Sequence, residues 1–595
     1  MPEVAAPVSL VERWQAAWPA ALAAWSPYTR LKPPMLCETA AAARAEGLTG
    51  SFAMIRLADQ AVVVDLEGVA AYGIEDCAVE VLAHEIGHHV YAPASVTEHL
   101  RCLARMQPAL PTLQRALPLV ANLWTDLLIN DRLQRSAGLA MDRVMLKVMA
   151  PKPGAAPAAA VWRLYARSYE LLWGLPAGSL AGPELPDDID ADARLIARLV
   201  RHHARRWLDA SVRFAAVLFP YLYDAGDAHG LQVWADTRDA GQGGDPDGLT
   251  QIDPAELRPP ALGDPELDRV GKAPLPSLPG AASPAKAGDG QTRDPYAFGE
   301  LLALGGLKLK PEQAAIRYYA ERARPWLVPF PGQPAPVAED ELPEGLSVWE
   351  TGEPLERIDW LESVRRQPQV VPGLTTVQRD YGQSPGRVER PRPLDLDLYV
   401  DSSGSMPDPR RALSWPALAG AVICLSALRA GASVHVTLWA SKQQVLTTPG
   451  FVRQADAALA VLTGYYGGGT QFPLTVLREL HAARVKLKRL THILLISDDG
   501  ASTMFDTPDE RGTPGLEVCA RALKQAGGGG TLALNLNDQW ERYRKPGNPW
   551  DWIGRARDEQ GWRVETVATL EGLLGFARRF ARLHYAGGRL REGGR

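Results

Sequence analysis

Two short runs in this sequence combine side chains that bind metal ions. The first is His84-Glu85-Ile86-Gly87-His88, in which two imidazoles stand four positions apart. On a helix this spacing puts both rings on one face, so both can reach a single zinc ion. Glu85 stands beside them and could accept a proton from a water molecule that the metal activates. The run therefore predicts a zinc site with a carboxylate as general base.

A third zinc ligand must come from another part of the chain. Asn122, Asp126 and Asn130 repeat every four residues within the otherwise apolar stretch 117–133. This period predicts a helix with one polar stripe. We take Asp126 as the third ligand, and we expect Asn130 or Asp131 to orient a histidine through its second ring nitrogen.

The segments around the histidines predict a small α+β framework. Two short strands are expected at 52–57 and 60–66, and a helix over 74–91 carries both histidines. Glu98 and His99, shortly after that helix, are alternative ligands. The order of strands followed by an H-E-x-x-H helix resembles the zinc metallopeptidases, and the resemblance implies peptide-bond hydrolysis. The metzincin spacing H-E-x-x-H-x-x-G-x-x-H is absent.

The second run offers only hard oxygen donors. Asp401, Ser403 and Ser405 alternate directly after the apolar, strand-like stretch 395–400. One carboxylate and two hydroxyls can therefore converge on one point, and such a set suits Mg²⁺ or Mn²⁺ rather than zinc or copper. An ordinary Ser/Gly turn has the same composition, so the prediction needs support from elsewhere in the chain.

That support comes from two later segments. Thr470 ends a Gly-rich loop, and Asp498 follows the apolar strand expected at 492–496, with Asp499 as the alternative acidic residue. Strands and helices alternate from 391 to 590, which predicts a parallel, doubly wound α/β sheet. In such sheets ligands gather at the carboxyl ends of the strands, and all three oxygen clusters fall at those ends.

This pattern resembles the von Willebrand factor A (vWA) domain, a Rossmann-like fold with a metal-ion-dependent adhesion site. The magnesium ligands that the resemblance implies are Asp401, Ser403 and Ser405 in the first loop, Thr470 in the second and Asp498 in the third. Ser-Asp-Asp-Gly stands where the family usually has Thr-Asp-Gly, so the choice between Asp498 and Asp499 stays open. The resemblance also implies that a partner protein completes the site with an Asp or Glu carboxylate.

The length and composition of the chain, together with the resemblances above, predict a multidomain protein with four parts. Residues 1–225 form a mainly helical, zincin-like α+β domain. Residues 226–305 are dominated by Gly, Pro, Asp and Ala and are predicted to be a disordered linker. Residues 306–390 are a connector, and residues 391–590 are the vWA-like domain.

The connector contains a tryptophan-bearing element that runs from Trp349 and Gly352 to Arg357, Asp359 and Trp360. This element resembles one that precedes vWA-like domains in bacterial proteins encoded beside MoxR-type AAA+ ATPases. Its two tryptophans could anchor the connector to the sheet domain. The chain has no G-x-x-x-x-G-K-[ST] run, so any ATP-driven work would need a partner.

The whole layout resembles bacterial proteins that join a metallopeptidase-like domain to a vWA domain. The resemblance implies a cytosolic adaptor that works with a MoxR-type ATPase to remodel or mature client proteins. The second interpretation is a non-catalytic binding protein in which the H-E-x-x-H site is structural or inactive.

The overall composition excludes several other classes. The net charge of −5, with 46% apolar and 22% charged residues, is that of an ordinary soluble protein and does not indicate a nucleic-acid partner. No uninterrupted apolar run reaches about eighteen residues, so no membrane span is expected. The five cysteines show no close pairing, and the N-terminus lacks the basic start of a secretory signal. We therefore expect a cytoplasmic protein rather than a secreted adhesin.

Overall fold

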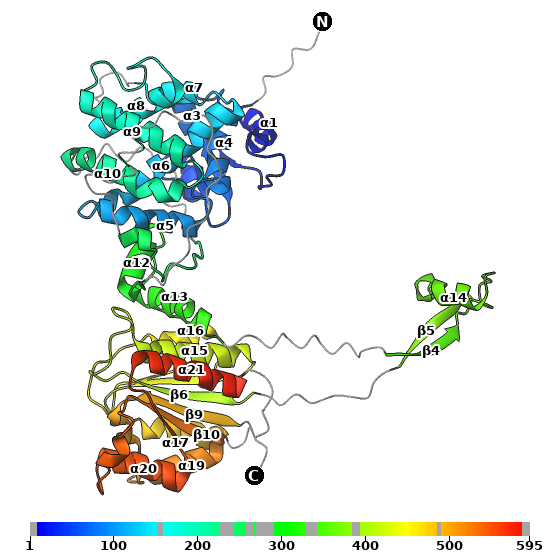
Figure 1. The fold of residues 1–595 in the computed structure, drawn as a ribbon, viewed down its shortest axis with the longest axis vertical. Helices are drawn as coiled ribbons and strands as arrows, with labels where there is room; N and C mark the ends of the chain where they lie inside the picture. Colours follow the sequence, from blue (N-terminus) through cyan, green and yellow to red (C-terminus); the bar gives the residue numbers. More distant parts are fainter. Residues whose placement is uncertain are drawn as a thin grey trace. The chain divides into compact units, whose positions relative to one another are not determined.

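The computed structural model describes residues 9–150, 159–225, 243–257, 267, 270, 291–327, 342–382, 393–484 and 490–585. The chain divides into two compact units: unit 1 comprises Met1–Arg322 with Pro407–Leu413, and unit 2 comprises Ala323–Met406 with Ser414–Arg595. The protein is therefore multidomain, with many helices and one six-stranded mixed sheet (Figure 1).

Unit 1 begins with a helix and a small sheet. The helix α1 (Leu10–Ala23) starts at a capping box between Ser9 and Glu12, and it continues through Pro19. The sheet has the order β1 (Met35–Cys37), β3 (Ala61–Asp65), β2 (Ala53–Arg56), in which β3 is parallel to β1 and antiparallel to β2. The sequence predicts β2 and β3, whereas β1 is too short to show a pattern.

Two helices at the centre of unit 1 lie close together because of one glycine. They are α4 (Ala78–Val90), which packs on β2 and α1, and α6 (Leu117–Arg132). A Cβ atom at Gly87 of α4 would lie 2.6 Å from both Ile129 of α6 and Trp25. Only a residue without a side chain allows this approach, so Gly87 sets the spacing between the two helices.

Four further helices of unit 1 contact α6, whose residues from Val120 to Asp131 are all buried. They are α5 (Val96–Met106), α8 (Ala160–Trp173), α9 (Asp187–His203) and α10 (Trp207–Ala225), whereas α7 (Met141–Val148) contacts α4. Further along the chain follow α12 (Pro295–Leu304) and α13 (Pro311–Ala323). The polar side chains of a helix that is buried on all sides must find partners inside the protein. The partners of the polar stripe on α6 therefore indicate what this stripe does.

The linker predicted over 226–305 falls partly outside the described residues. Where it is described, the structure differs from the prediction. Residues 243–257 are ordered, and α12 contacts α5. A buried ion pair joins Arg293 and Glu256 at 2.8 Å. Composition alone could not predict this packing, because the charged residues have the polarity of a linker and become buried only through their tertiary partners.

Unit 2 contains the large sheet, in the order β11, β10, β9, β6, β7, β8. The strands are β6 (Asp395–Asp401), β7 (Val434–Trp439), β8 (Val445–Thr447), β9 (Thr491–Ser497), β10 (Gly527–Leu534) and β11 (Arg563–Thr566). All neighbours are parallel except the edge strand β8, which is antiparallel to β7. The doubly wound parallel sheet is thus present, and β8 is an addition that the sequence did not indicate.

Helices cover both faces of this sheet (Figure 1). One face carries α15 (Trp415–Arg429), α16 (Ala455–Leu462) and α21 (Leu570–Tyr585), and the other carries α17 (Leu474–Arg484), α19 (Gly515–Ala526) and α20 (Pro549–Gln560). From β6 the chain crosses to β7 on one side, and from β9 it crosses to β10 on the other. The carboxyl ends of β6 and β9 therefore form the switch point at which such sheets bind ligands.

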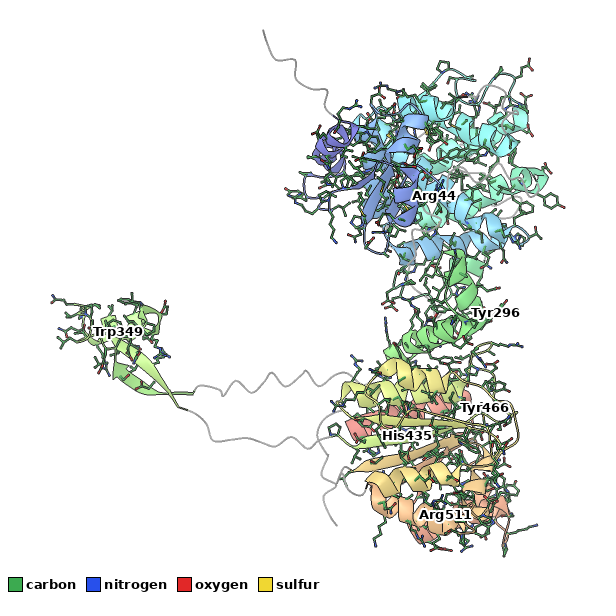
Figure 2. All side chains as sticks on the ribbon, turned by 180° about the vertical axis from the view of Figure 1, so that it is seen from behind. Arg44, Tyr296, Trp349, His435, Tyr466 and Arg511 are labelled. Atoms are coloured by element: carbon green, nitrogen blue, oxygen red, sulfur yellow. The ribbon has the colours of Figure 1, made fainter. Side chains whose placement is uncertain are left out.

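The connector forms a small hairpin with one helix. Its strands β4 (Leu342–Val348) and β5 (Val377–Gly382) are antiparallel, and α14 (Trp360–Arg366) lies between them in the sequence. Trp349, labelled in Figure 2, is buried in this hairpin, and its indole N–H donates to the carbonyl of Pro354 at 3.2 Å. Trp360 is 55% exposed. The two tryptophans predicted to act alike thus have different surroundings.

In the described part of the chain, no helix combines the length and apolarity needed to cross a membrane. All five cysteines are buried and free.

Candidate metal centres

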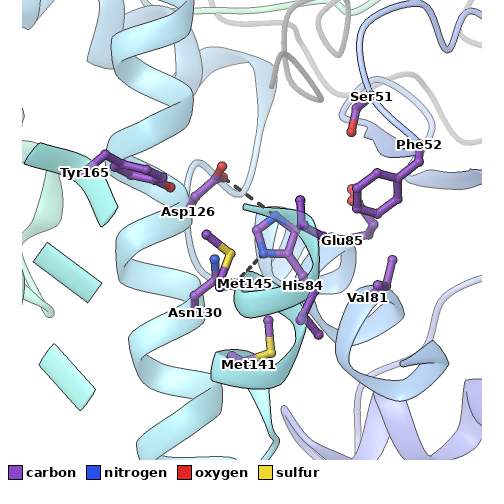
Figure 3. A pocket seen from close by; sticks show the side chains of 12 residues that line it. Ser51, Phe52, Val81, His84, Glu85, Asp126, Asn130, Met141, Met145 and Tyr165 are labelled. Carbon is purple, nitrogen blue, oxygen red and sulfur yellow. Dashed lines mark hydrogen bonds and ion pairs between the residues drawn. The ribbon is translucent and has the colours of Figure 1, made fainter. Parts of the chain in front are cut away.

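The structure brings the predicted zinc ligands of unit 1 together. Helix α4 carries His84 and His88, and α6 carries Asp126. Figure 3 shows His84 and Asp126 facing each other. The carboxylate oxygen Oδ1 of Asp126 lies 3.7 Å from Nε2 of His84 and 3.4 Å from Nε2 of His88. The three ligand atoms all lie within 4.8 Å of one another.

The separations between these atoms fit a zinc ion. Zinc holds nitrogen and oxygen ligands at about 2.0 to 2.1 Å in a tetrahedron, so neighbouring ligand atoms should be about 3.3 Å apart. The two separations from Asp126, 3.4 and 3.7 Å, are close to that value and longer than ordinary hydrogen bonds. Three protein ligands also leave a fourth position open, as catalytic zinc sites do.

The second ring nitrogen of each histidine is held by the chain. Nδ1 of His84 lies 2.7 Å from Oδ1 of Asn130, and Nδ1 of His88 lies 3.0 Å from the carbonyl oxygen of Ala92. If each Nδ1 donates a proton to its oxygen, Nε2 is the ligand atom in both rings. Of the two candidates for orienting a histidine, Asn130 therefore occupies that place, whereas Asp131 accepts from Arg135 at 2.9 Å.

The alternative ligands lie outside the group. The carboxylate of Glu98 accepts from Arg101 at 2.6 Å. His99 is buried in α5, and burial together with the nearby His88 lowers its pKa to about 4.

Glu85 lies in a pocket beside the candidate zinc ligands. It is 2% exposed, and it lines a cavity of about 40 Å³ together with His84 and Asp126. The remaining wall is formed by Ser51, Phe52, Val81, Asn130, Met141, Val144, Met145, Val148 and Tyr165 (Figure 3). A volume of this size holds about two to four water molecules. The site can therefore hold a metal ion and water in a mostly apolar setting.

In unit 2, four of the five predicted magnesium ligands are joined by hydrogen bonds. The backbone N–H of Ser403 donates to Oδ1 of Asp401 at 2.8 Å. The hydroxyls of Ser403 and Ser405 lie 3.1 Å apart, and Ser405 donates to Oδ2 of Asp498 at 2.9 Å. An octahedral magnesium ion, with ligands at about 2.0 to 2.1 Å, requires neighbouring oxygens about 2.9 Å apart. The spacing of these oxygens thus fits a hard divalent cation.

The fifth residue, Thr470, lies beside this cluster. The Gly-rich loop is held against the first loop because Gly404 donates its N–H to the carbonyl of Gly468 at 2.9 Å. A Cβ atom at Gly500 would lie 2.3 Å from Cγ2 of Thr470, so the threonine stands against the loop that carries Asp498. Asp498 makes the contact with the first loop, whereas Asp499 is exposed. The geometry therefore favours Asp498.

The two carboxylates of this cluster influence each other. Burial raises the pKa of Asp401 above its ordinary value, and the charge of Asp498 adds to the rise. Hydrogen bonds from Ser497 and Ser403 act in the opposite direction. A divalent cation between the carboxylates would offset their repulsion.

The sequence analysis missed several residues that hold these centres in place. In unit 2, Ser497 donates to Oδ2 of Asp401 at 2.6 Å. The sequence could have pointed to Ser497, because its hydroxyl stands at the carboxyl end of β9, the strand next to β6. In unit 1, Tyr169 accepts from the side-chain amide of Asn130 at 2.8 Å, and Tyr165 lies 2.9 Å from Tyr169. The separation in sequence between Asn130 and Tyr169 left no signal for this pairing.

No established protein-family model and no curated protein matches this chain. Among solved structures, the pilus adhesin SpaC from Lactobacillus rhamnosus GG is 13% identical, with a TM-score of 0.24, over 32% of this chain and 30% of that chain. A mutant of the PilB minor pilin from Streptococcus sanguinis is 14% identical, with a TM-score of 0.24, over 36% of this chain and 67% of that chain. An RSR protein from Deinococcus radiodurans is 16% identical, with a TM-score of 0.19, over 89% and 96% of the two chains. The matched region thus spans less than a third of the pilus adhesin, and scores this low carry no conclusion about fold or function.

Proposed function

We propose that unit 1 is a zincin-like metallopeptidase that holds one zinc ion with His84, His88 and Asp126. The observation that carries this proposal is the convergence of three zinc-type ligand atoms within 4.8 Å of one another, beside a pocket that His84, Asp126 and Glu85 line. A histidine pair one helical turn apart with a carboxylate beside it is the arrangement that metal-assisted hydrolysis requires.

The residues of the chain have separate tasks in such a reaction. A bound zinc ion would supply Lewis-acid activation of a carbonyl group and of a water molecule. Glu85 accepts the proton of the attacking water at its carboxylate and returns it to the nitrogen of the leaving amine. Phe52, Met141 and Met145 restrict bulk water at the site, which strengthens the charge interactions there.

The substitution Glu85→Gln tests this proposal. The variant should keep the zinc content of the wild type and lose about 10²-fold or more of its peptide hydrolysis, because it removes the proton acceptor and no metal ligand. Zinc is measured by atomic emission and hydrolysis with a fluorogenic peptide library. Glu80→Gln, the same change on the same helix, is the control and should hydrolyse at the wild-type rate. A Glu85→Gln variant that is as active as the wild type would disprove the proposed mechanism.

The second candidate function is a binding protein whose zinc site is structural. The small volume of the cavity favours it, because about 40 Å³ admits water and not a peptide. In that case the wild type binds zinc and hydrolyses no peptide in the library, and zinc removal lowers its melting temperature. A wild type that hydrolyses peptides, together with an inactive Glu85→Gln variant, rules this alternative out.

For unit 2 we propose a vWA domain that binds a protein partner through Mg²⁺ or Mn²⁺. The support is the position of Asp401, Ser403, Ser405, Thr470 and Asp498 at the switch point of the sheet. Most of these ligands are neutral oxygens, so a bound divalent cation keeps positive character and can accept a carboxylate from the partner.

Two substitutions test the magnesium proposal. Asp401→Ala should abolish Mn²⁺ binding measured by electron paramagnetic resonance, and it should abolish divalent-cation-dependent capture of the partner. Asp499→Ala should leave both unchanged, since that side chain is exposed beside the site. If partner binding survives both Asp401→Ala and EDTA, the proposal is wrong.

For the whole protein we propose a cytoplasmic adaptor of the metallopeptidase–vWA type that acts with a MoxR-type AAA+ ATPase on client proteins. The support is that the connector element and both metal-binding motifs resemble those of bacterial metallopeptidase–vWA proteins. A MoxR-type ATPase itself uses Mg²⁺, so EDTA would remove the metal from the ATPase as well as from the site at Asp401. Chelation therefore cannot show which of the two metal sites the interaction needs. The test is therefore binding of the purified ATPase to wild type and to Asp401→Ala in the same Mg²⁺ buffer. Equal binding would refute a role for the site in that partnership.

A further inference from the structure

The short helix α7 forms one wall of the candidate zinc pocket. Its four buried side chains, Met141, Val144, Met145 and Val148, have the spacing that places them on one face of the helix. All four line the pocket together with His84, and Figure 3 shows Met141 and Met145 on this wall. The buried face of α7 therefore covers the pocket beside the candidate ligands.

Two cations on the opposite face of α7 share one carboxylate. Arg143 and Lys147 lie one turn apart, and both contact Asp76 in the loop before α4, Lys147 at 2.6 Å. Lys147 also donates to the carbonyl of Gly73 at 2.7 Å. The side chains of Asp76 and Arg143 are 45% and 54% exposed, so water screens the attraction between them. We call Asp76 with Arg143 and Lys147 the latch.

A displacement of α7 would leave the candidate ligands in place. Helices α4 and α6 carry these ligands at the centre of unit 1, and α8 contacts α6 and α9. The main packing partners of α7 are α4 and the turn Leu133–Ala137, and α7 follows Gly138, whose φ of 70° is left-handed. Elements that move at active sites have few buried contacts and begin at residues that absorb a change in backbone angles. Helix α7 has both properties.

The pocket beneath α7 is too small for a peptide. Its volume of about 40 Å³ admits water, and Glu85 and His88 are 2% and 0% exposed. Hydrolysis of a peptide therefore requires that one wall open. We propose that α7 is a lid over the candidate zinc pocket, which the latch keeps closed to peptides and whose displacement admits the substrate. The inference rests on the function proposed for unit 1, and it accounts for the small cavity within that function.

The substitution Asp76→Asn tests the latch. The amide keeps the shape of the side chain and removes the charge that Arg143 and Lys147 share. Two half-exposed ion pairs shift an equilibrium only modestly, so the open fraction should rise about 3- to 10-fold. Because the apparent affinity of a ligand that binds only the open state is proportional to the open fraction, its binding should improve by the same factor.

Two zinc-binding probes of different size report the position of the lid. Acetohydroxamic acid is small, whereas a dipeptide hydroxamate carries the same metal-binding group and is too large for the closed pocket. In calorimetry with the zinc-loaded full chain, Asp76→Asn should bind the dipeptide hydroxamate about 3- to 10-fold more tightly than the wild type. Its affinities for acetohydroxamic acid and for zinc should stay within about twofold of the wild type, because neither depends on the open state.

The matched control is Asp190→Asn. Asp190 of α9 also accepts from two cations, Arg167 at 2.7 Å and Arg194 at 2.8 Å, and it does not line the pocket. The same loss of charge at this position should leave the affinities for both hydroxamates at their wild-type values.

A second measurement follows the lid without zinc. Val81 of α4 is 4% exposed and lines the pocket, and all five native cysteines are buried. In the metal-free full chain, the thiol introduced by Val81→Cys should react with a thiol reagent about 3- to 10-fold faster when Asp76→Asn is added. Asp76→Asn without Val81→Cys gives the background from the native thiols. Val144→Cys, on the pocket face of α7, is the second variant should Val81→Cys fail to fold.

The outcomes distinguish this inference from the proposed function. If Asp76→Asn leaves the affinity for the dipeptide hydroxamate or the labelling rate at its wild-type value, the inference is overturned, whether or not peptides are hydrolysed. An equal gain for both hydroxamates also overturns it, because the change then acts at the metal and not on access. If the wild type hydrolyses no peptide but Asp76→Asn shows the selective gain and the faster labelling, the lid is real and the proposed activity is wrong. If the chain binds no zinc, the proposed zinc site fails and the labelling rates alone decide the lid.

Discussion

At the scale of single residues, a buried carboxylate away from both metal centres has an unusual setting. Asp397 of β6 is fully buried, and its two oxygens each lie 2.8 Å from a histidine nitrogen, one of His435 and one of His481 (His435 is labelled in Figure 2). Burial alone would raise the pKa of this carboxyl group. The hydrogen bonds from the two histidines outweigh burial and lower the pKa to about 2.

This lowered pKa predicts how the stability of unit 2 depends on pH. The folded state binds the proton of Asp397 more weakly than the unfolded state, whose carboxyl titrates near pH 4. The group therefore stabilises the fold above pH 4, and this contribution of about 2 kcal/mol is lost as the pH falls from 4 to 2. Urea unfolding of the full chain between pH 2 and 7 measures it. Asp397→Asn should remove this part of the pH dependence, and an unchanged profile would contradict the assignment.

At the scale of elements, the candidate zinc centre depends on how closely α4 and α6 approach each other. The histidines and Asp126 are each positioned by their own helix, and the distance between the ligand atoms is set at Gly87. Here a Cβ atom would lie 2.6 Å from Ile129 and from Trp25.

We therefore expect Gly87→Ala to separate the two helices. The substitution should destabilise unit 1 by about 1 to 3 kcal/mol, because overpacking forces neighbours out of their positions. Zinc affinity should fall with it, as the three ligand atoms move apart. Adding Ile129→Ala removes one of the two clashing groups and should restore part of the affinity. Isothermal calorimetry with zinc compares the variants, and a Gly87→Ala variant with wild-type affinity would show that the helix spacing does not control the site.

At the scale of the whole molecule, the two candidate metal centres belong to different units. The candidate zinc ligands lie within Met1–Arg322, and the candidate magnesium ligands lie in unit 2, at the end of β6 and in the loops beyond the strands. Each unit has its own core, so each should unfold as a separate cooperative transition.

This division predicts independent responses to metal removal. The double substitution His84→Ala with His88→Ala should lower the melting temperature of one calorimetric transition and leave the other in place. Asp401→Ala should shift the melting temperature of the other transition, that of unit 2, and leave the zinc content of the protein unchanged. Differential scanning calorimetry of the full chain measures both transitions. If both shift together in either variant, the units are energetically coupled and the prediction is wrong.

The sequence by itself determined those features of the two candidate sites that depend on the spacing of residues within one helix or one loop. His84 and His88 share a helix face because they are four residues apart, and Asp401, Ser403 and Ser405 converge because they follow a strand in a tight loop. Helix and strand periodicity also sufficed for the elements that carry them, from α4 and α6 to β6 and β9. The alternation of strands and helices was enough to predict the doubly wound sheet.

Only the tertiary structure decided how these elements meet. Asn130 and Asp131 are adjacent in the sequence but point about 100° apart on a helix, so the rotation of α6 against α4 selects Asn130. The same holds for Asp498 over Asp499, because the loop after β9 turns one carboxylate to Ser405 and the other to solvent. Tyr165 and Tyr169 joined the site through the contact between α6 and α8, which no local pattern encodes. Side-chain spacing follows from backbone geometry within one element, whereas contacts between elements follow from packing across the whole core.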